Sequence, residues 1–190
     1  MIRNRKYIAG LLFVLVFLGK AVSFANEEDS IYTVHPPQLS VPSGKPGEIR
    51  RIIMQFHYWT LICDENKTVK QGICNVTQTI YNDKEGNKVF SWSLVSTKGG
   101  QPVMLLRTLP NANTNVPIQV FMEGVKKPLL ISYKQCNKEI CLAQYPIGPV
   151  LMEQISKSSN VRISYQLKEG KTLSFVTPFK GLSEALFSLQ

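Results

Sequence analysis

The four cysteines of this chain follow an N-terminus that fixes their chemistry, and this combination constrains the fold more than any other feature. Three basic residues among the first six precede an apolar run over Tyr7–Gly19, and Ser23-Phe24-Ala25 supplies small residues where signal peptidase reads. The sequence therefore predicts a secretory signal peptide over residues 1–25, with cleavage after Ala25. A retained membrane anchor is the alternative, but the run is shorter than the about 20 residues of a span, and Lys20 interrupts it.

Cys63, Cys74, Cys136 and Cys141 all lie in the part that would be exported, where an even number of cysteines predicts two disulfides. Three pairings are possible. Sequence order favours Cys63–Cys74 and Cys136–Cys141, because each bridge would then close a short loop. Zinc binding is the alternative, but neither pair has the two-residue gap of a common zinc knuckle, and no Cys-x-x-Cys redox motif is present.

Length and charge bound the class of the exported protein. Removing residues 1–25 from the 190 leaves 165, which suits a single domain. The segment carries four basic and no acidic residues, so the net charge falls from +9 to +5. A charge of this size does not indicate a nucleic-acid partner; it would attract anionic lipid, lipopolysaccharide or an acidic host surface, or serve solubility alone. No later apolar stretch is long enough to span a membrane, so no integral span is expected after signal removal.

Residues 26–49 read as a flexible lead-in, because the segment is polar, contains four prolines and has no helical period. Compact structure is expected to begin near Arg50, so that residues 50–190 form one disulfide-stabilised domain.

Alternating apolar residues predict about eight strands in that domain. In Lys88–Ser96, for example, Phe90, Trp92 and Leu94 share one face. The predicted strands cover residues 58–63, 74–81, 88–96, 102–108, 117–122, 128–133, 161–167 and 171–177. Two short helices are predicted, one beginning at Gly148-Pro149 and one over residues 182–189. These elements indicate a mainly β protein, an antiparallel β-sandwich decorated by the helices, in which Trp59 and a disulfide fill the core.

The sequence offers little for catalysis. His35 falls in the proline-rich segment, where nothing is expected to orient it, and His57 reads as a surface or half-buried residue at a strand edge. There is no Gly-x-Ser-x-Gly elbow, phosphate-binding loop or dinucleotide fingerprint, and no two carboxylates stand out as a glycosidase pair. We therefore expect no catalytic residues, no cofactor and no metal.

Lysines flank several predicted turns. If those turns share one end of the sandwich, they would form a basic patch that binds a surface, although ordinary lysine-rich turns would give the same pattern. The candidate surface-binding residues are Lys84, Lys88, Lys126, Lys127 and Lys138.

Several short motifs occur in a characteristic order. They are Trp59-Thr60-Leu61-Ile62-Cys63, Cys74-Asn75-Val76-Thr77-Gln78, Leu109-Pro110, Tyr133-Lys134-Gln135-Cys136, Cys141-Leu142-Ala143 and Phe179-Lys180-Gly181-Leu182-Ser183-Glu184-Ala185-Leu186. With these motifs, the four cysteines and the signal peptide, the chain resembles the invasion-associated locus B family of exported proteins of Bartonella and other alphaproteobacteria. The family commonly has a Gly-rich turn after Leu-Pro and Gly-Phe near the end; here Asn111–Asn115 and Gly181-Leu182 replace them.

The resemblance implies an immunoglobulin-like β-sandwich and a role in bacterial entry into host cells, especially erythrocytes. It implies a location in the periplasm, at the outer membrane or outside the cell, and it carries over only the four cysteines, as disulfide partners. We therefore expect a non-enzymatic envelope protein that binds a host or bacterial surface component. The alternatives are a general periplasmic binding or envelope-assembly module, with an indirect effect on invasion, and an unrecognised hydrolase.

Overall fold

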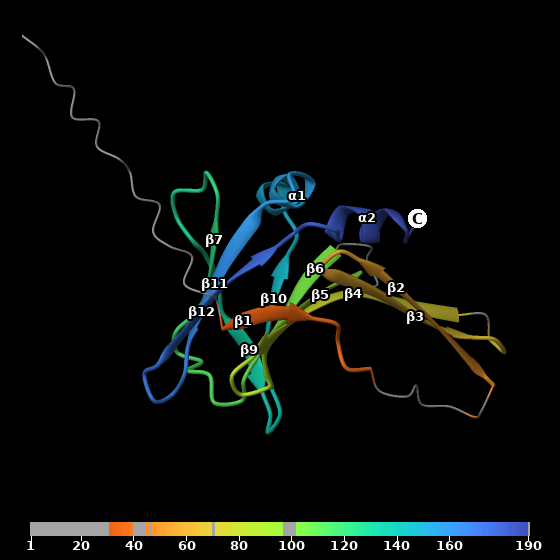
Figure 1. Ribbon diagram of the computed structural model, residues 1–190, viewed down its shortest axis with the longest axis horizontal. Coiled ribbons are helices and arrows are strands. Elements are labelled where there is room, and N and C mark those ends of the chain that lie inside the picture. Colours follow the sequence, from red (N-terminus) through yellow and green to blue (C-terminus); the bar gives the residue numbers. More distant parts are fainter. Residues whose placement is uncertain (1–30, 40–44, 46, 70, 97–101, 190) are drawn as a thin grey trace, which may run out of the picture.

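The computed structural model describes residues 31–39, 45, 47–69, 71–96 and 102–189, and it is mainly β (Figure 1). The predicted signal peptide lies outside the described residues. The strands are β1 (Tyr32–His35), β2 (Ile49–Phe56), β3 (Trp59–Asn66), β4 (Gln71–Asn82), β5 (Asn87–Ser96), β6 (Pro102–Thr108), β7 (Ile118–Met122), β8 (Leu129–Ile131), β9 (Tyr133–Cys136), β10 (Cys141–Pro146), β11 (Asn160–Gln166) and β12 (Thr172–Pro178). The helices are α1 (Pro149–Ser156) and α2 (Leu182–Phe187).

The strands form two antiparallel sheets. The larger has the order β2-β3-β4-β5-β6-β10-β9, and β1 pairs with the second half of β4, beyond the part that pairs with β3. The smaller has the order β12-β11-β7-β8. Successive hairpins join β2 to β6, so this half of the large sheet is a meander, for which two-fold side-chain alternation is the expected sequence pattern.

The two sheets pack against each other through their apolar faces. Phe90 of β5 lies 5.2 Å from Phe175 of β12, measured between ring centroids, and Tyr32 of β1 lies 5.7 Å from the same ring. Tyr165 of β11 donates a hydrogen bond of 2.6 Å to the carbonyl oxygen of Val89 in β5, which ties the layers together at a buried point. The alternation predicted for Phe90, Trp92 and Leu94 is confirmed, because all three side chains are buried in this core.

Both tryptophans lie at the centre of the core rather than at the surface. The Trp59 ring stacks 5.3 Å from Trp92, and Trp92 lies 5.3 Å from Phe179, which precedes α2. Gln78, which is 1% exposed, lies beside them, and the Trp92 Nε1 donates to its Oε1 at 2.7 Å. The Gln78 amide donates in turn to the Pro178 carbonyl at 3.1 Å, and the same carbonyl accepts the Trp59 Nε1 at 3.2 Å. Buried indoles require such partners, so this network links β3, β4 and β5 to the end of β12.

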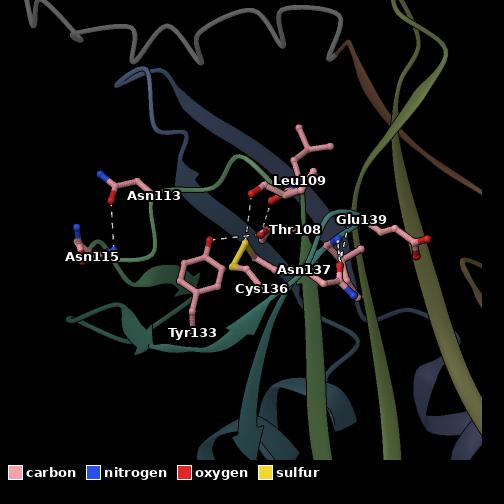
Figure 2. Close-up of a disulfide and its surroundings, with 11 residues drawn as sticks. Thr108, Leu109, Asn113, Asn115, Tyr133, Cys136, Asn137 and Glu139 are labelled. Carbon is pink, nitrogen blue, oxygen red and sulfur yellow. Dashed lines mark hydrogen bonds between the residues drawn. A yellow bond between two sulfur atoms is a disulfide. The ribbon is translucent and has the colours of Figure 1, made fainter.

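The disulfides join Cys63 to Cys74 and Cys136 to Cys141, the pairing that sequence order favoured. Each links directly opposite residues of an antiparallel pair, with 4.0 Å between the Cα atoms. The second bridge closes the β9–β10 hairpin (Figure 2), whose turn is held by the Asn137 side-chain oxygen; this oxygen accepts the backbone N–H groups of two later residues at 2.8 Å. An asparagine that folds its own turn in this way is a common hairpin device.

The helices cover one end of the sandwich (Figure 1). In α1, Pro149 occupies the start of the helix, and Leu151 and Ile155 face the core as the spacing predicts. In α2, Leu182 and Ala185 are buried. The predicted helix extended to Leu189, but the helix ends at Phe187 and Leu189 is 42% exposed.

The observed strands differ from the predicted ones at four places. β1, within the lead-in, forms a ladder with β4, so ordered structure starts before Arg50. β2 was not predicted because its apolar residues do not alternate, and β10 was not predicted because Cys, Ala and Gln are weak strand indicators. The single strand expected over residues 128–133 breaks at Ser132, where the chain passes from the small sheet (β8) to the large one (β9). The boundaries of the three predicted chain regions stay predictions.

Candidate functional site

The five lysines proposed from the sequence are all exposed, but they do not lie at one end of the sandwich. Lys84 and Lys88 flank the β4–β5 turn and Lys138 lies in the β9–β10 turn; the register of β5, β6 and β10 places these two turns at the same end of the large sheet. Lys126 and Lys127 lie in the β7–β8 turn, at the end of the small sheet away from the β11–β12 turn. The β11–β12 turn hydrogen-bonds to the segment just after β6, so the two lysine groups lie at opposite ends (Figure 1).

The outer face of the large sheet is hollowed instead. Its side chains alternate with the core residues of the same strands, and they line a groove of about 600 Å³, which we call the outer groove. Its floor carries small polar side chains from β4 and β5, and one cation from β6. These residues are Asn75, Thr77, Thr79, Ser91, Ser93 and Arg107.

Arg107 is the end of a hydrogen-bonded chain across the floor of the outer groove. Its Nη1 donates to the Ser93 Oγ at 2.7 Å, the Ser93 hydroxyl lies 3.4 Å from the Thr77 Oγ1, and Thr77 donates to the Trp92 carbonyl at 3.1 Å. Burial lowers the pKa of Arg107, because moving a guanidinium out of water disfavours its charged form. The side chain is half-buried on the face of the sheet.

The carboxylate in the groove is already neutralised. Asp64 receives two hydrogen bonds of 2.6 Å from Arg51, and the hydrogen bond from this guanidinium lowers the pKa of the carboxyl and raises that of Arg51. Besides Arg51, the cations lining the groove are Arg107 and Lys88, and neither forms an ion pair among the residues that the structure describes. The outer groove thus has an excess of positive charge over a floor of hydroxyl groups.

The expectation that nothing orients His35 is wrong. Because β1 pairs with β4, the His35 Nε2 lies 2.8 Å from the Asp83 carboxylate and 2.7 Å from the Thr33 Oγ1, and the ring packs edge-on against Tyr81 at 5.1 Å. Hydrogen bonds from Thr33 and then His35 lower the pKa of Asp83. One imidazole nitrogen contacts both partners, whereas a hydrolase triad needs the nucleophile and the carboxylate on opposite nitrogens.

His57 lies in the β2–β3 turn, exposed and with a positive φ of 51°, in line with a surface histidine. Its neighbour in space is Gly181 (φ 95°), where a Cβ would overlap the Phe56 carbonyl oxygen. Within the described ranges there is no group of three His, Cys, Asp or Glu residues suited to a metal ion, and no helix has the length and hydropathy to cross a membrane.

Arg107 was not among the residues predicted from the sequence, although a signal was present. The residue follows the apolar run Val103-Met104-Leu105-Leu106 within one predicted strand, so a cation directly follows a row of apolar residues. On β4, Thr77 and Thr79 alternate with core residues in the same way as Ser91 and Ser93 do on β5. Only the register shows that these positions share one face of the sheet.

Comparison with known proteins gives one family. A family model described as "Invasion associated locus B (IalB) protein" matches residues 59–190. The crystal structure of invasion associated protein b from Bartonella henselae is similar with a TM-score of 0.61 and 14% sequence identity, covering 73% of this chain and 94% of that chain. At this identity the similarity shows the fold alone. A comparison with curated proteins found no match.

Proposed function

Since the chain belongs to the invasion associated locus B family, we propose that it is an exported envelope protein that supports bacterial invasion of host cells, erythrocytes in particular. The family that the sequence motifs indicated is thereby confirmed. The proposal rests on one observation: the family match runs from the first residue of β3 to the end of the chain, and so includes both disulfides. Disulfides persist in oxidising compartments, which supports a location outside the cytoplasm.

The proposed mode of action is binding rather than catalysis. The geometry around His35 favours this, because its shared nitrogen provides no proton relay between Thr33 and Asp83. The outer groove also favours it, since a concave face lined by hydroxyl groups and an unneutralised cation suits recognition of a ligand. For the fold, the immunoglobulin-like arrangement is part of the proposal, and a strand-by-strand comparison of the two sheets with immunoglobulin domains tests it.

One observation supports the alternative of a periplasmic assembly module. β2 is the edge strand of the large sheet, eight residues long, and it exposes Ile53 (50%) and Met54 (39%). An open strand edge with apolar side chains can pair with an extended segment of another envelope protein. In that case the effect on invasion would be indirect.

Surface exposure in the native bacterium separates the two functions. Intact cells are treated with external protease, and cell and medium fractions are then immunoblotted, with a known periplasmic protein as the control. Digestion of this protein while the control stays intact, or release into the medium, supports direct contact with host cells. Protection until the outer membrane is opened would refute direct binding and leave the periplasmic role.

The lysines at the two ends provide a matched test of how a surface is bound. Lys84→Gln with Lys88→Gln and Lys126→Gln with Lys127→Gln remove the same charge from opposite ends of the molecule. If one end binds red-cell membranes electrostatically, only that pair weakens binding, and added salt weakens binding of the unmodified protein as well. If both variants bind as tightly as the unmodified protein at all salt concentrations, these lysines are excluded as the contact.

A further inference from the structure

We propose that the outer groove binds an acidic oligosaccharide, with Arg107 pairing to a sugar carboxylate. The inference names the ligand class for the binding role proposed above and rests on that role. Its starting point is Arg107 itself, a guanidinium that burial has partly desolvated and that no carboxylate among the described residues neutralises. Such a charge is costly in the free protein and becomes favourable when a ligand supplies the counter-charge.

The guanidinium has hydrogen-bonding capacity to spare. It carries five N–H donors, and within the described part of the chain it makes a single hydrogen bond, from Nη1 to the Ser93 Oγ at 2.7 Å. This bond fixes the plane of the side chain and leaves a pair of donors for the two oxygens of a carboxylate. Carboxylate recognition of this bidentate kind distinguishes arginine from lysine.

The surroundings of Arg107 suit a sugar. In the sheet register, Ser91 lies opposite Arg107 and Thr79 lies opposite Ser91, so a row of largely covered hydroxyl groups, 8% and 3% exposed, extends from the cation along the floor of the groove. These groups both donate and accept, as sugar hydroxyls do. The Asn75 side-chain oxygen, also in the groove lining, has no hydrogen-bond partner in the described structure, so the lining is not fully satisfied internally.

Size and charge agree with this ligand class. A volume of about 600 Å³ lies within the range of about 300–1,000 Å³ of ligand sites. Asp64 does not repel an anion, because Arg51 neutralises it, and Lys88 adds a second positive charge to the lining. Uronic acids of bacterial envelope polysaccharides and sialic acids of animal cell surfaces share the required chemistry, a carboxylate on a polyhydroxylated ring.

The test uses the exported, disulfide-bonded protein and a trisaccharide of galacturonic acid, with binding measured by calorimetry. The methyl ester of the same trisaccharide is the matched control, because it keeps the shape and removes the charge. We expect the acid to bind at least about 10-fold more tightly than the ester, and Arg107→Gln to remove this difference. Arg107→Lys keeps the charge without the bidentate geometry and is expected to lose part of the affinity. Lys134→Gln, an exposed cation on β9 that does not line the groove, is expected to bind as the unmodified protein does.

Equal binding of acid and ester by the unmodified protein would overturn the inference, and this comparison needs no variant to fold. Unchanged binding by a folded Arg107→Gln would overturn it too. A sialylated trisaccharide run against its neutral parent distinguishes the sources: a preference for the sialylated sugar indicates the animal cell surface, and a preference for galacturonate indicates the bacterial envelope. If bacteria that lack this protein invade poorly but the unmodified protein shows no preference for the acid over the ester, this site is refuted and the proposed function stands.

Discussion

Gln78 is the residue whose replacement tests the core of the structure most directly. It is 1% exposed, its Oε1 accepts hydrogen bonds from the Trp92 indole and the Thr177 hydroxyl, and its amide donates to the Pro178 carbonyl. Gln78→Met keeps the length of the side chain and removes all of these hydrogen bonds. The indole and the hydroxyl are then left buried without an acceptor.

The expected loss follows from those two donors. Each buried polar group left without a hydrogen-bond partner costs about 1–3 kcal/mol of unfolding free energy. The methionine side chain offsets part of this cost, because it is easier to bury than the polar amide that it replaces. We therefore expect the free energy of unfolding to fall by about 2–4 kcal/mol, a large fraction of the about 5–15 kcal/mol of an ordinary domain. Thr177→Val removes one of the two donors left without an acceptor. The unfolding free energy of the Gln78→Met, Thr177→Val double variant is therefore expected to fall by about 1 kcal/mol less than the sum of the losses in the two single variants.

Urea unfolding followed by tryptophan fluorescence measures this directly, because both tryptophans of the chain belong to the cluster that Gln78 joins. Far-UV circular dichroism checks that unfolding stays two-state. Gln144→Met is the matched control, since Gln144 is exposed on β10. If Gln78→Met and the control differ by less than about 0.5 kcal/mol, the hydrogen-bond argument is refuted.

Three further changes probe other parts of the fold. Gly181→Ala is expected to lower the unfolding free energy by about 2–4 kcal/mol, because it adds backbone strain and an overlap with the Phe56 carbonyl. Gly170→Ala is the control, since Gly170 has a φ of 88° and open space around it, and it should cost about 1 kcal/mol. Equal melting temperatures of the two variants would contradict the close approach of Gly181 to Phe56. The hydrogen bond from Arg51 lowers the carboxyl pKa of Asp64 in the folded protein, so the contribution of this ion pair to stability is present above the ordinary pKa of 3.8 and is lost as the pH falls through the lowered folded pKa. Asp64→Asn should therefore flatten the acid part of a curve of unfolding free energy against pH. An unchanged acid part in this variant would exclude the ion pair as its cause. Replacing both cysteines of the β3–β4 bridge by serine should lower the unfolding free energy by about 3 kcal/mol. The same replacement at the β9–β10 bridge should lower it by about 2 kcal/mol, because that bridge closes a shorter loop. A larger loss for the β9–β10 variant, measured by urea unfolding, would contradict the loop-entropy argument.

Local sequence pattern determined those elements that bury one face and have clear turns at their ends. The strand over Pro102–Thr108 agrees with the prediction at both ends, and the helix beginning at Pro149 was also expected. The disulfide pairing could be anticipated because each bridge joins cysteines that are close along the chain and become opposite one another in a hairpin.

Strands with another source of stability could not be predicted in this way. β1 is four residues long in a segment with several prolines, and it exists because the second half of β4 offers unpaired backbone groups beyond β3. His35 acquires its partner Asp83 by the same pairing, across 48 residues of sequence. No local pattern contains that information.

By itself, the sequence indicated the family, favoured the cysteine pairing and determined the mainly β composition, because motifs, short loops and alternation are all local. Only the tertiary structure decided that the lysines divide between two ends, and that Arg107 lies among hydroxyl groups on one outer face. The physical reason is that a strand specifies which residues point the same way, while register and sheet order specify which strands are neighbours. A binding face built from several strands is set by that second kind of information.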